Sequence, residues 1–188
     1  MGTAGWIVIG LLVLIGLWLV MTYNGLVSLR QRCRQAFSDI DVQLKQRHDL
    51  VPNLVETVKG YASHERGTLE AVIQARNAAV TAQGPAAQAQ AEGILQGALR
   101  QLFALAEAYP DLKANQNFQQ LQGELSDLEN KIAAARRFFN NTAAEYNATR
   151  EGFPAVLFAQ SMGFGPQEFF NLEETERTAV KTAPQVKF

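Results

Sequence analysis

The first charged side chain of this 188-residue chain is that of Arg30, and the residues before it are uncharged and mostly apolar. The apolar stretch from Ala4 to Tyr23 has the length of about 20 residues with which a helix crosses a hydrocarbon core of roughly 30 Å. A removable signal peptide would carry a basic region before this stretch and an Ala-x-Ala-like exit after it, and neither occurs. We therefore expect a transmembrane helix at residues 4–23, after a short N-terminal end at 1–3.

Three basic residues, Arg30, Arg32 and Arg34, follow the apolar stretch closely, whereas its N-terminal side carries only the α-amino group. An excess of arginine marks the cytoplasmic flank of a membrane span. The sequence thus predicts a single-pass protein whose N-terminus is outside and whose remaining chain is in the cytoplasm. Basic side chains beside a bilayer also attract anionic headgroups, so the three arginines are candidate membrane-surface residues.

The rest of the chain is long enough for one domain with its own core and short for two. The formal net charge is −1, so the chain lacks the basic footprint of a nucleic-acid-binding protein. The single cysteine, Cys33, has no partner for an internal disulfide and stands at an apolar helical position, where a small core residue is expected.

Apolar residues between 24 and 150 recur at spacings of three and four without strand-like alternation, which predicts helices throughout. We expect the membrane helix to continue outward as one rod. We expect a first break at Asp49–Pro52, because proline disfavours the helical conformation of the residue before it and suits a first helical turn. A second helix would then run from Pro52 to Gly84–Pro85, and a third from 86 to 109.

The fourth helix carries the clearest pattern, with an expected cap at Asn115 or Asn117 and apolar residues in a near-strict heptad. The seam consists of Phe118, Leu121, Leu125, Leu128, Ile132, Ala135, Phe139 and Thr142. Short connections make consecutive helices antiparallel neighbours. The predicted fold is all-α: an N-terminal transmembrane helix followed, at 24–150, by an antiparallel four-helix, coiled-coil-like bundle that returns Arg150 to the bilayer surface.

A Phe-rich segment at 151–172 follows the bundle, and an irregular tail is expected at 173–188. The segment has three possible roles: it dips into the membrane interface, caps the open end of the bundle, or packs on a neighbouring protomer. The candidate membrane-surface residues of this segment are Phe153, Phe158, Phe164, Phe169 and Phe170.

No motif for enzymatic chemistry occurs. Four-helix bundles hold di-iron centres with Glu-x-x-His pairs, and the chain has no such pair. Its two histidines, His48 and His64, would lie roughly 24 Å apart on a continuous helix, too far to share a metal. Neither a Gly-x-Ser-x-Gly turn nor a phosphate-binding glycine loop is present. We expect no enzymatic activity, no cofactor and no metal.

A polar cluster surrounds the predicted first turn of the bundle. Two interpretations of this cluster are open. It is a solvated helix face with pairs such as Asp41 and Lys45 four residues apart, or it is a surface that recognises a partner protein. The candidate partner-binding residues are Asp41, Lys45, Arg47, His48, Asp49 and Asn53.

Several long motifs resemble the LemA family. They are YNGLVSLR at 23–30, AFSDIDVQLKQRHDLVPNLVETVKGYASHE at 36–65, YPDLKANQNFQQLQGEL at 109–125, ENKIAAARRFFNN at 129–141, Tyr146-Asn147, Phe153-Pro154 and Gly163-Phe164. Phe37 and Phe139 stand where the family often has Trp and Tyr, which puts any hydrogen bond there in doubt. The resemblance implies a single-pass protein of a bacterial-type cell membrane with a helical-bundle domain, no established enzymatic activity, and one branch tied to magnetosome membrane formation.

Two functional hypotheses follow. The first is a non-enzymatic scaffold that forms homo-oligomers and organises the membrane or partner proteins. The alternative is an adaptor that presents substrates to a membrane protease or a similar membrane machine through the polar cluster. The expected partners are the lipid bilayer, further copies of the chain and a membrane protein.

Overall fold

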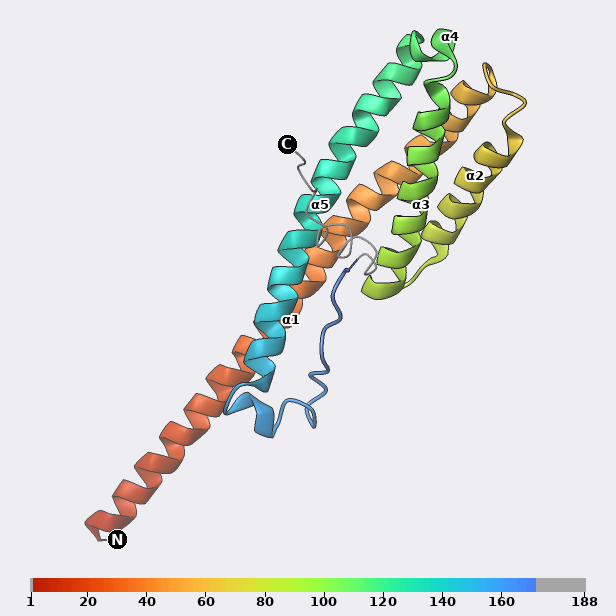
Figure 1. The fold of residues 1–188 in the computed structure, drawn as a ribbon. Helices are drawn as coiled ribbons and strands as arrows, with labels where there is room; N and C mark the ends of the chain where they lie inside the picture. Colours follow the sequence, from red (N-terminus) through yellow and green to blue (C-terminus); the bar gives the residue numbers. More distant parts are fainter. Residues whose placement is uncertain (1, 172–188) are drawn as a thin grey trace, which may run out of the picture. The chain divides into compact units, whose positions relative to one another are not determined.

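The computed structural model describes residues 2–171 and contains, within them, five α-helices, one 3₁₀ turn and no strand. The elements are α1 (Thr3–Lys59), α2 (Arg66–Thr81), α3 (Pro85–Ala106), α4 (Pro110–Lys113), α5 (Gln116–Glu151) and η1 (Ala155–Leu157) (Figure 1). The all-α prediction is confirmed. The predicted tail at 173–188, and residue 172 of the Phe-rich segment, lie outside the described residues.

The described residues form two compact units, each of which takes part of α1 and part of α5. We call residues 2–38 and 137–168 the anchor unit, and residues 39–136 and 169–171 the bundle unit.

Helix α1 is uninterrupted from Thr3 to Lys59, so the expected continuation of the membrane helix into the next helix is confirmed. Its apolar side chains between Trp6 and Met21 are exposed. A helix that is apolar on all sides needs an apolar environment around it. By length and composition α1 can cross a membrane, and it fits a membrane location.

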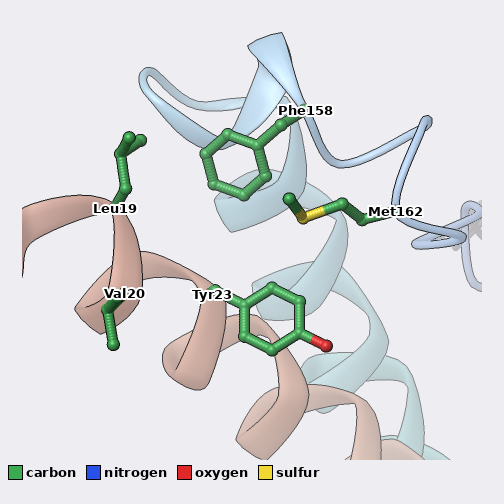
Figure 2. Close-up of a pocket in the computed structure, with 5 residues that line it drawn as sticks. All are labelled: Leu19, Val20, Tyr23, Phe158 and Met162. Carbon is green, nitrogen blue, oxygen red and sulfur yellow. The ribbon is translucent and has the colours of Figure 1, made fainter. Parts of the chain in front are cut away.

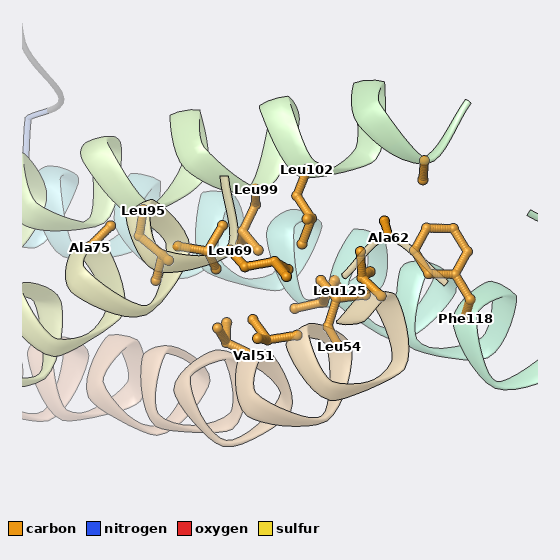
Figure 3. Packing of buried hydrophobic residues seen from close by; sticks show 14 of the residues in the cluster. Val51, Leu54, Ala62, Leu69, Ala75, Leu95, Leu99, Leu102, Phe118 and Leu125 are labelled. Carbon is orange, nitrogen blue, oxygen red and sulfur yellow. The ribbon is translucent and has the colours of Figure 1, made fainter. Parts of the chain in front are cut away.

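In the bundle unit, the second half of α1, then α2, α3 and the first part of α5, run in alternating directions (Figure 1). In Figure 3, Leu95, Leu99 and Leu102 point from α3 toward the other helices. The buried core of this unit includes Val51, Leu54, Val58, Leu69, Val72, Leu95, Leu99, Leu102, Leu112, Phe118 and Leu125. The predicted antiparallel bundle is therefore confirmed in this unit.

Helix α5 begins where its sequence signals predict. The side-chain Oδ1 of Asn115 accepts a hydrogen bond of 3.0 Å from the backbone N–H of Phe118, which satisfies a donor that a helix start leaves free. Most of the predicted seam is buried, namely Phe118, Leu125, Leu128, Ile132, Phe139 and Thr142, with Leu121 and Ala135 half-buried. Knobs-into-holes packing of this seam stays a prediction.

The predicted break at Asp49–Pro52 is wrong, because α1 runs through Pro52 and the first turn lies at residues 60–65. The apolar stripe of α1 continues across the proline, with Val51, Leu54 and Val58 all buried. Burial of this stripe in the bundle core outweighs the local preference of proline for a helix start.

The neighbouring helix supplies the hydrogen bond that Pro52 cannot make. Proline has no N–H, so it leaves the carbonyl of His48, four residues earlier, without its helical donor. Arg76 of α2 donates from Nε to this oxygen at 3.1 Å. The carbonyl is thus satisfied from outside its own helix, as buried backbone groups require.

We expect Arg76→Met to lower the free energy of unfolding by about 1–3 kcal/mol, because the carbonyl of His48 loses its donor. In a Pro52→Ala background the same substitution should cost less, since the alanine N–H replaces that donor. Denaturant unfolding of the detergent-solubilised full-length protein measures both costs. Arg66→Met, at an exposed position of the same helix, is the control. An equal cost of Arg76→Met with Pro52 and with Ala at residue 52 would show that Arg76 does not replace the donor that proline lacks.

Candidate functional site

The six residues predicted to bind a partner lie within α1 and not at a turn. They differ in accessibility: Arg47 and His48 are buried, Asp41 is half-buried, and Lys45, Asp49 and Asn53 are exposed. Their role in partner binding stays a prediction.

Arg47 and His48 belong to a network of charged side chains inside the bundle unit. Arg47 Nη1 donates to Glu92 Oε2 at 3.1 Å, and Arg47 Nη2 donates to the Glu129 carboxylate. His48 Nε2 lies 2.5 Å from Glu92 Oε1. Glu92 is on α3 and Glu129 on α5, so the network joins three helices.

The network is deeply buried at its centre, where the exposed fraction is 3% for Arg47 and 4% for Glu92. A charge in such a position is costly unless it is paired and hydrogen-bonded. Glu92 has a partner for each carboxylate oxygen, and the second oxygen of Glu129 accepts from Gln96 Nε2 at 2.5 Å. These groups satisfy one another, and a shift of α3 or α5 along α1 would leave buried charge unpaired.

The sequence prediction missed Glu92 and Glu129. A signal for Glu92 was present, because it stands at helical spacing between Ala89 and Leu95, which are buried on the same stripe of α3. A single carboxylate on an otherwise apolar stripe indicates a buried cationic partner. Glu129 is half-buried beside the seam of α5 and carried no comparable signal.

A hollow of 380 Å³, lined by charged and polar side chains and also by Leu44, Ala79 and Val80, opens beside the network on the surface of the bundle unit. Four of the predicted partner-binding residues line it, together with residues of α2 and α3: Asp41, Lys45, His48, Asp49, Arg76 and Gln88. Gln88 Nε2 donates to Asp41 Oδ1 at 3.2 Å. The hollow therefore presents groups of both charge signs at one place.

No three His, Cys, Asp or Glu side chains within residues 2–171 gather so as to hold a metal ion. The thiol of Cys33 is buried, and its Sγ lies 3.4 Å from the carbonyl oxygen of Thr142. Burial raises the pKa of this thiol, Arg32 opposes the shift and Glu145 adds to it. A thiol that stays protonated is a poor nucleophile and metal ligand.

The three arginines after the apolar stretch differ in their contacts within the anchor unit. The guanidinium of Arg30 lies 4.7 Å from the ring centroid of Phe164, within the range of a cation–π contact. Arg32 is 3.6 Å from Glu145 in an exposed ion pair, and Arg34 is exposed.

The five candidate phenylalanines divide into buried and exposed residues. Phe164 and Phe170 are buried, Phe158 is half-buried, and Phe153 and Phe169 are exposed. In the bundle unit, the guanidinium of Arg136 lies 5.5 Å from the Phe170 ring centroid. Phe164 and Phe170 therefore serve as core residues of their own units, whereas Phe153 does not.

Three residues of α5 hold the segment after η1 in place. The hydroxyl of Tyr146 donates to the carbonyl of Gly165 at 2.9 Å, and Arg150 Nε donates to the carbonyl of Phe164 at 3.0 Å. Asn147 donates to the Gln167 carbonyl and accepts from the Gln167 N–H, both at 2.8 Å. We call Tyr146, Asn147 and Arg150 the clasp.

Burial raises the pKa of the Tyr146 hydroxyl, against the opposing effect of Arg30 and Arg150. The hydroxyl therefore remains protonated and able to donate.

The two departures from the family pattern lie together in the same unit, where the rings of Phe37 and Phe139 are 5.4 Å apart between centroids. An aromatic contact thus replaces any hydrogen bond that Trp or Tyr side chains would make at these two positions.

We expect Glu92→Leu to destabilise the protein by about 3–5 kcal/mol, because it removes the buried carboxylate that both Arg47 and His48 contact. Of its partners among residues 2–171, Arg47 would then keep only Glu129. The exposed ion pair of Glu107 with Lys113 gives a matched control, since Glu107→Leu should cost about 1 kcal/mol or less. Denaturant unfolding followed by circular dichroism measures both. Similar costs for the two variants would show that the network contributes no more than a surface pair.

The sequence model of the LemA family matches residues 36–188. The chain is 29% identical to Protein LemA of Metamycoplasma hominis, over 85% of this chain and 74% of that protein. It is 26% identical to Magnetosome protein MamQ of Magnetospirillum gryphiswaldense, over 89% of this chain and 71% of that protein.

A second magnetosome protein, MamQ 2 of Paramagnetospirillum magneticum, is 25% identical over the same shares of the two chains, 89% and 71%. None of these names states an enzymatic activity. The region matched by the family includes the buried charge network and the clasp. This chain belongs to the LemA family.

Proposed function

We propose that this protein is a non-enzymatic, single-pass membrane scaffold, with its bundle in the cytoplasm, that self-associates and organises the membrane or partner proteins. The proposal depends on the continuity of α1. One helix holds the exposed apolar side chains from Trp6 to Met21 and the buried core residues from Val51 to Val58. Anchor and domain are therefore built from the same element, with no linker between them.

The charge pattern supports the proposed orientation. Arg30, Arg32 and Arg34 follow the apolar part of α1 directly, which is the arrangement of a cytoplasmic flank. The relatives named for the magnetosome carry the name of a cellular structure and not of a reaction, which suits an organising role.

An exposed face of α3 supports the proposed self-association. Its small or apolar residues lie at helical spacing and are Ala87, Ile94, Gly97 and Ala104, with the exposed Gln90 and Gln101 between them. A Cβ atom added at Gly97 would meet nothing within 4 Å. Small residues let a second helix approach closely, and this position faces open space in the single chain.

Light scattering of the full-length protein in nanodiscs should return a discrete oligomer, whereas a version that starts at Tyr23 should be smaller. We expect Gly97→Arg to reduce the oligomer to monomer, because the added side chain occupies the space that a second helix needs. Helicity should be kept, because that space is open in the single chain. Gly123→Arg is the matched control, since that glycine of α5 is exposed and equally free of neighbours. A monomer of the unaltered protein, together with cross-linking in intact membranes that returns only monomer, would refute self-association.

A second candidate function is an adaptor that presents partners or substrates to a membrane protease or a similar machine. The hollow beside the network favours it, because Lys45 and Asp49, which line it, are exposed and carry opposite charges four residues apart on α1. Paired charges of this kind give specificity for a complementary segment of another protein.

Exchanging the two charges, with Lys45→Glu and Asp49→Lys, should abolish cross-linking to a membrane-protein partner while the oligomer size stays unchanged. The same exchange at the exposed pair Glu56 and Lys59 of α1 is the control. Retention of every cross-linked partner in the first variant would refute the adaptor function and leave the scaffold unaffected.

A further inference from the structure

The anchor unit exposes a second apolar surface besides that of α1. It lies on the segment that follows α5, where the exposed fraction is 73% for Phe153 and 72% for Leu157. Val156 and Met162 of the same segment are also more than half exposed. Several large apolar side chains exposed within one short segment suit a contact surface, although Gln160 and Ser161 between them are polar. We call residues 153–162 the wedge.

Two aromatic contacts, one at the start of the wedge and one directly after it, fix its level along α1. The ring of Phe153 lies 5.6 Å from that of Trp18, and the ring of Phe164 lies 5.4 Å from that of Tyr23. Trp18 belongs to the apolar part of α1. The wedge therefore lies alongside the end of the part of the helix that is suited to the membrane.

The rise of a helix, 1.5 Å per residue, converts these contacts into depth. Trp18 precedes Tyr23 by roughly 8 Å and Arg30 by roughly 18 Å along the axis. Charged Arg30 belongs at the headgroup level, where its guanidinium covers the Phe164 ring. On this scale Phe153, beside Trp18, lies at the level of the hydrocarbon.

An apolar groove of 660 Å³ lies between part of the wedge and α1. Figure 2 shows its two walls: Leu19, Val20 and Tyr23 on the helix, with Phe158 and Met162 opposite them. Leu19 and Val20 also belong to the exposed apolar surface of the helix. The groove is thus continuous with the surface that faces the membrane in the proposed function.

We propose that the wedge inserts into the leaflet from which α1 emerges, and that the groove holds an acyl chain of a bilayer phospholipid. Lipid is the occupant that matches the apolar lining and its continuity with the span. The band of Arg30, Arg32 and Arg34 lies on the water side of it, where it attracts an anionic headgroup. This inference rests on the proposed membrane anchor.

The clasp explains how the wedge is held at this level. Arg150, Tyr146 and Asn147 bind the backbone from Phe164 to Gln167, directly after the wedge. The wedge is thereby attached at both ends to α5, at its start by the chain itself. Insertion needs no rearrangement of these hydrogen bonds.

The test uses the full-length protein in liposomes of phosphatidylcholine and phosphatidylglycerol. In a Cys33→Ala background, an environment-sensitive fluorophore is attached to Leu157→Cys or Met162→Cys. Leu12→Cys, in the exposed apolar part of α1, reports the anchor, and Ile73→Cys, exposed on α2, reports water. Nitroxide groups on lipid acyl chains quench labels in the bilayer, whereas iodide quenches labels in water.

We expect the labels at residues 157 and 162 to behave like the label at residue 12, with several-fold stronger quenching by acyl-chain nitroxide than the label at residue 73. Iodide access to residues 157 and 162, with residue 12 still in lipid, would overturn the wedge and leave the anchor intact. Iodide access at all four positions would refute both. Shielding of residues 157 and 162 from both quenchers would mean that protein, such as a second copy, covers the surface, and would overturn the lipid assignment.

Discussion

The bundle depends on the need to neutralise one buried guanidinium. Arg47 is almost inaccessible to water, and its charge is matched by carboxylates from α3 and α5. A slide of one helix past another would separate these charges inside the protein, and a buried charge without its partner is costly. The apolar core drives the helices together, and the Arg47 network favours the register in which its charges meet.

The sequence could predict those features that arise from periodicity and from local caps. The heptad of α5, its start at Asn115 and the continuity of α1 beyond the apolar stretch all follow from spacing that a single helix displays. These signals are local, because each depends on residues within a few turns of one another. They were sufficient for the fold class and for the antiparallel arrangement.

The sequence could not predict features that depend on a partner distant along the chain. Pro52 suggested a helix start because the donor that replaces its missing hydrogen bond, Arg76, lies on another helix. Arg47 and His48 looked like surface residues because their anions are on α3 and α5. The phenylalanines after α5 have similar local sequence, and only the fold separates buried Phe164 from exposed Phe153.

The hydrogen bonds of Asn147 have an evolutionary consequence. They bind the main-chain N–H and carbonyl of Gln167, and the other two members of the clasp likewise bind main-chain carbonyls. Every residue type except proline offers the same N–H and carbonyl at such a place. The side chains of residues 165–167 can therefore change without loss of these hydrogen bonds, whereas Phe164 is also constrained by the burial of its ring. The three residues of α5 that form the clasp carry the remaining constraint.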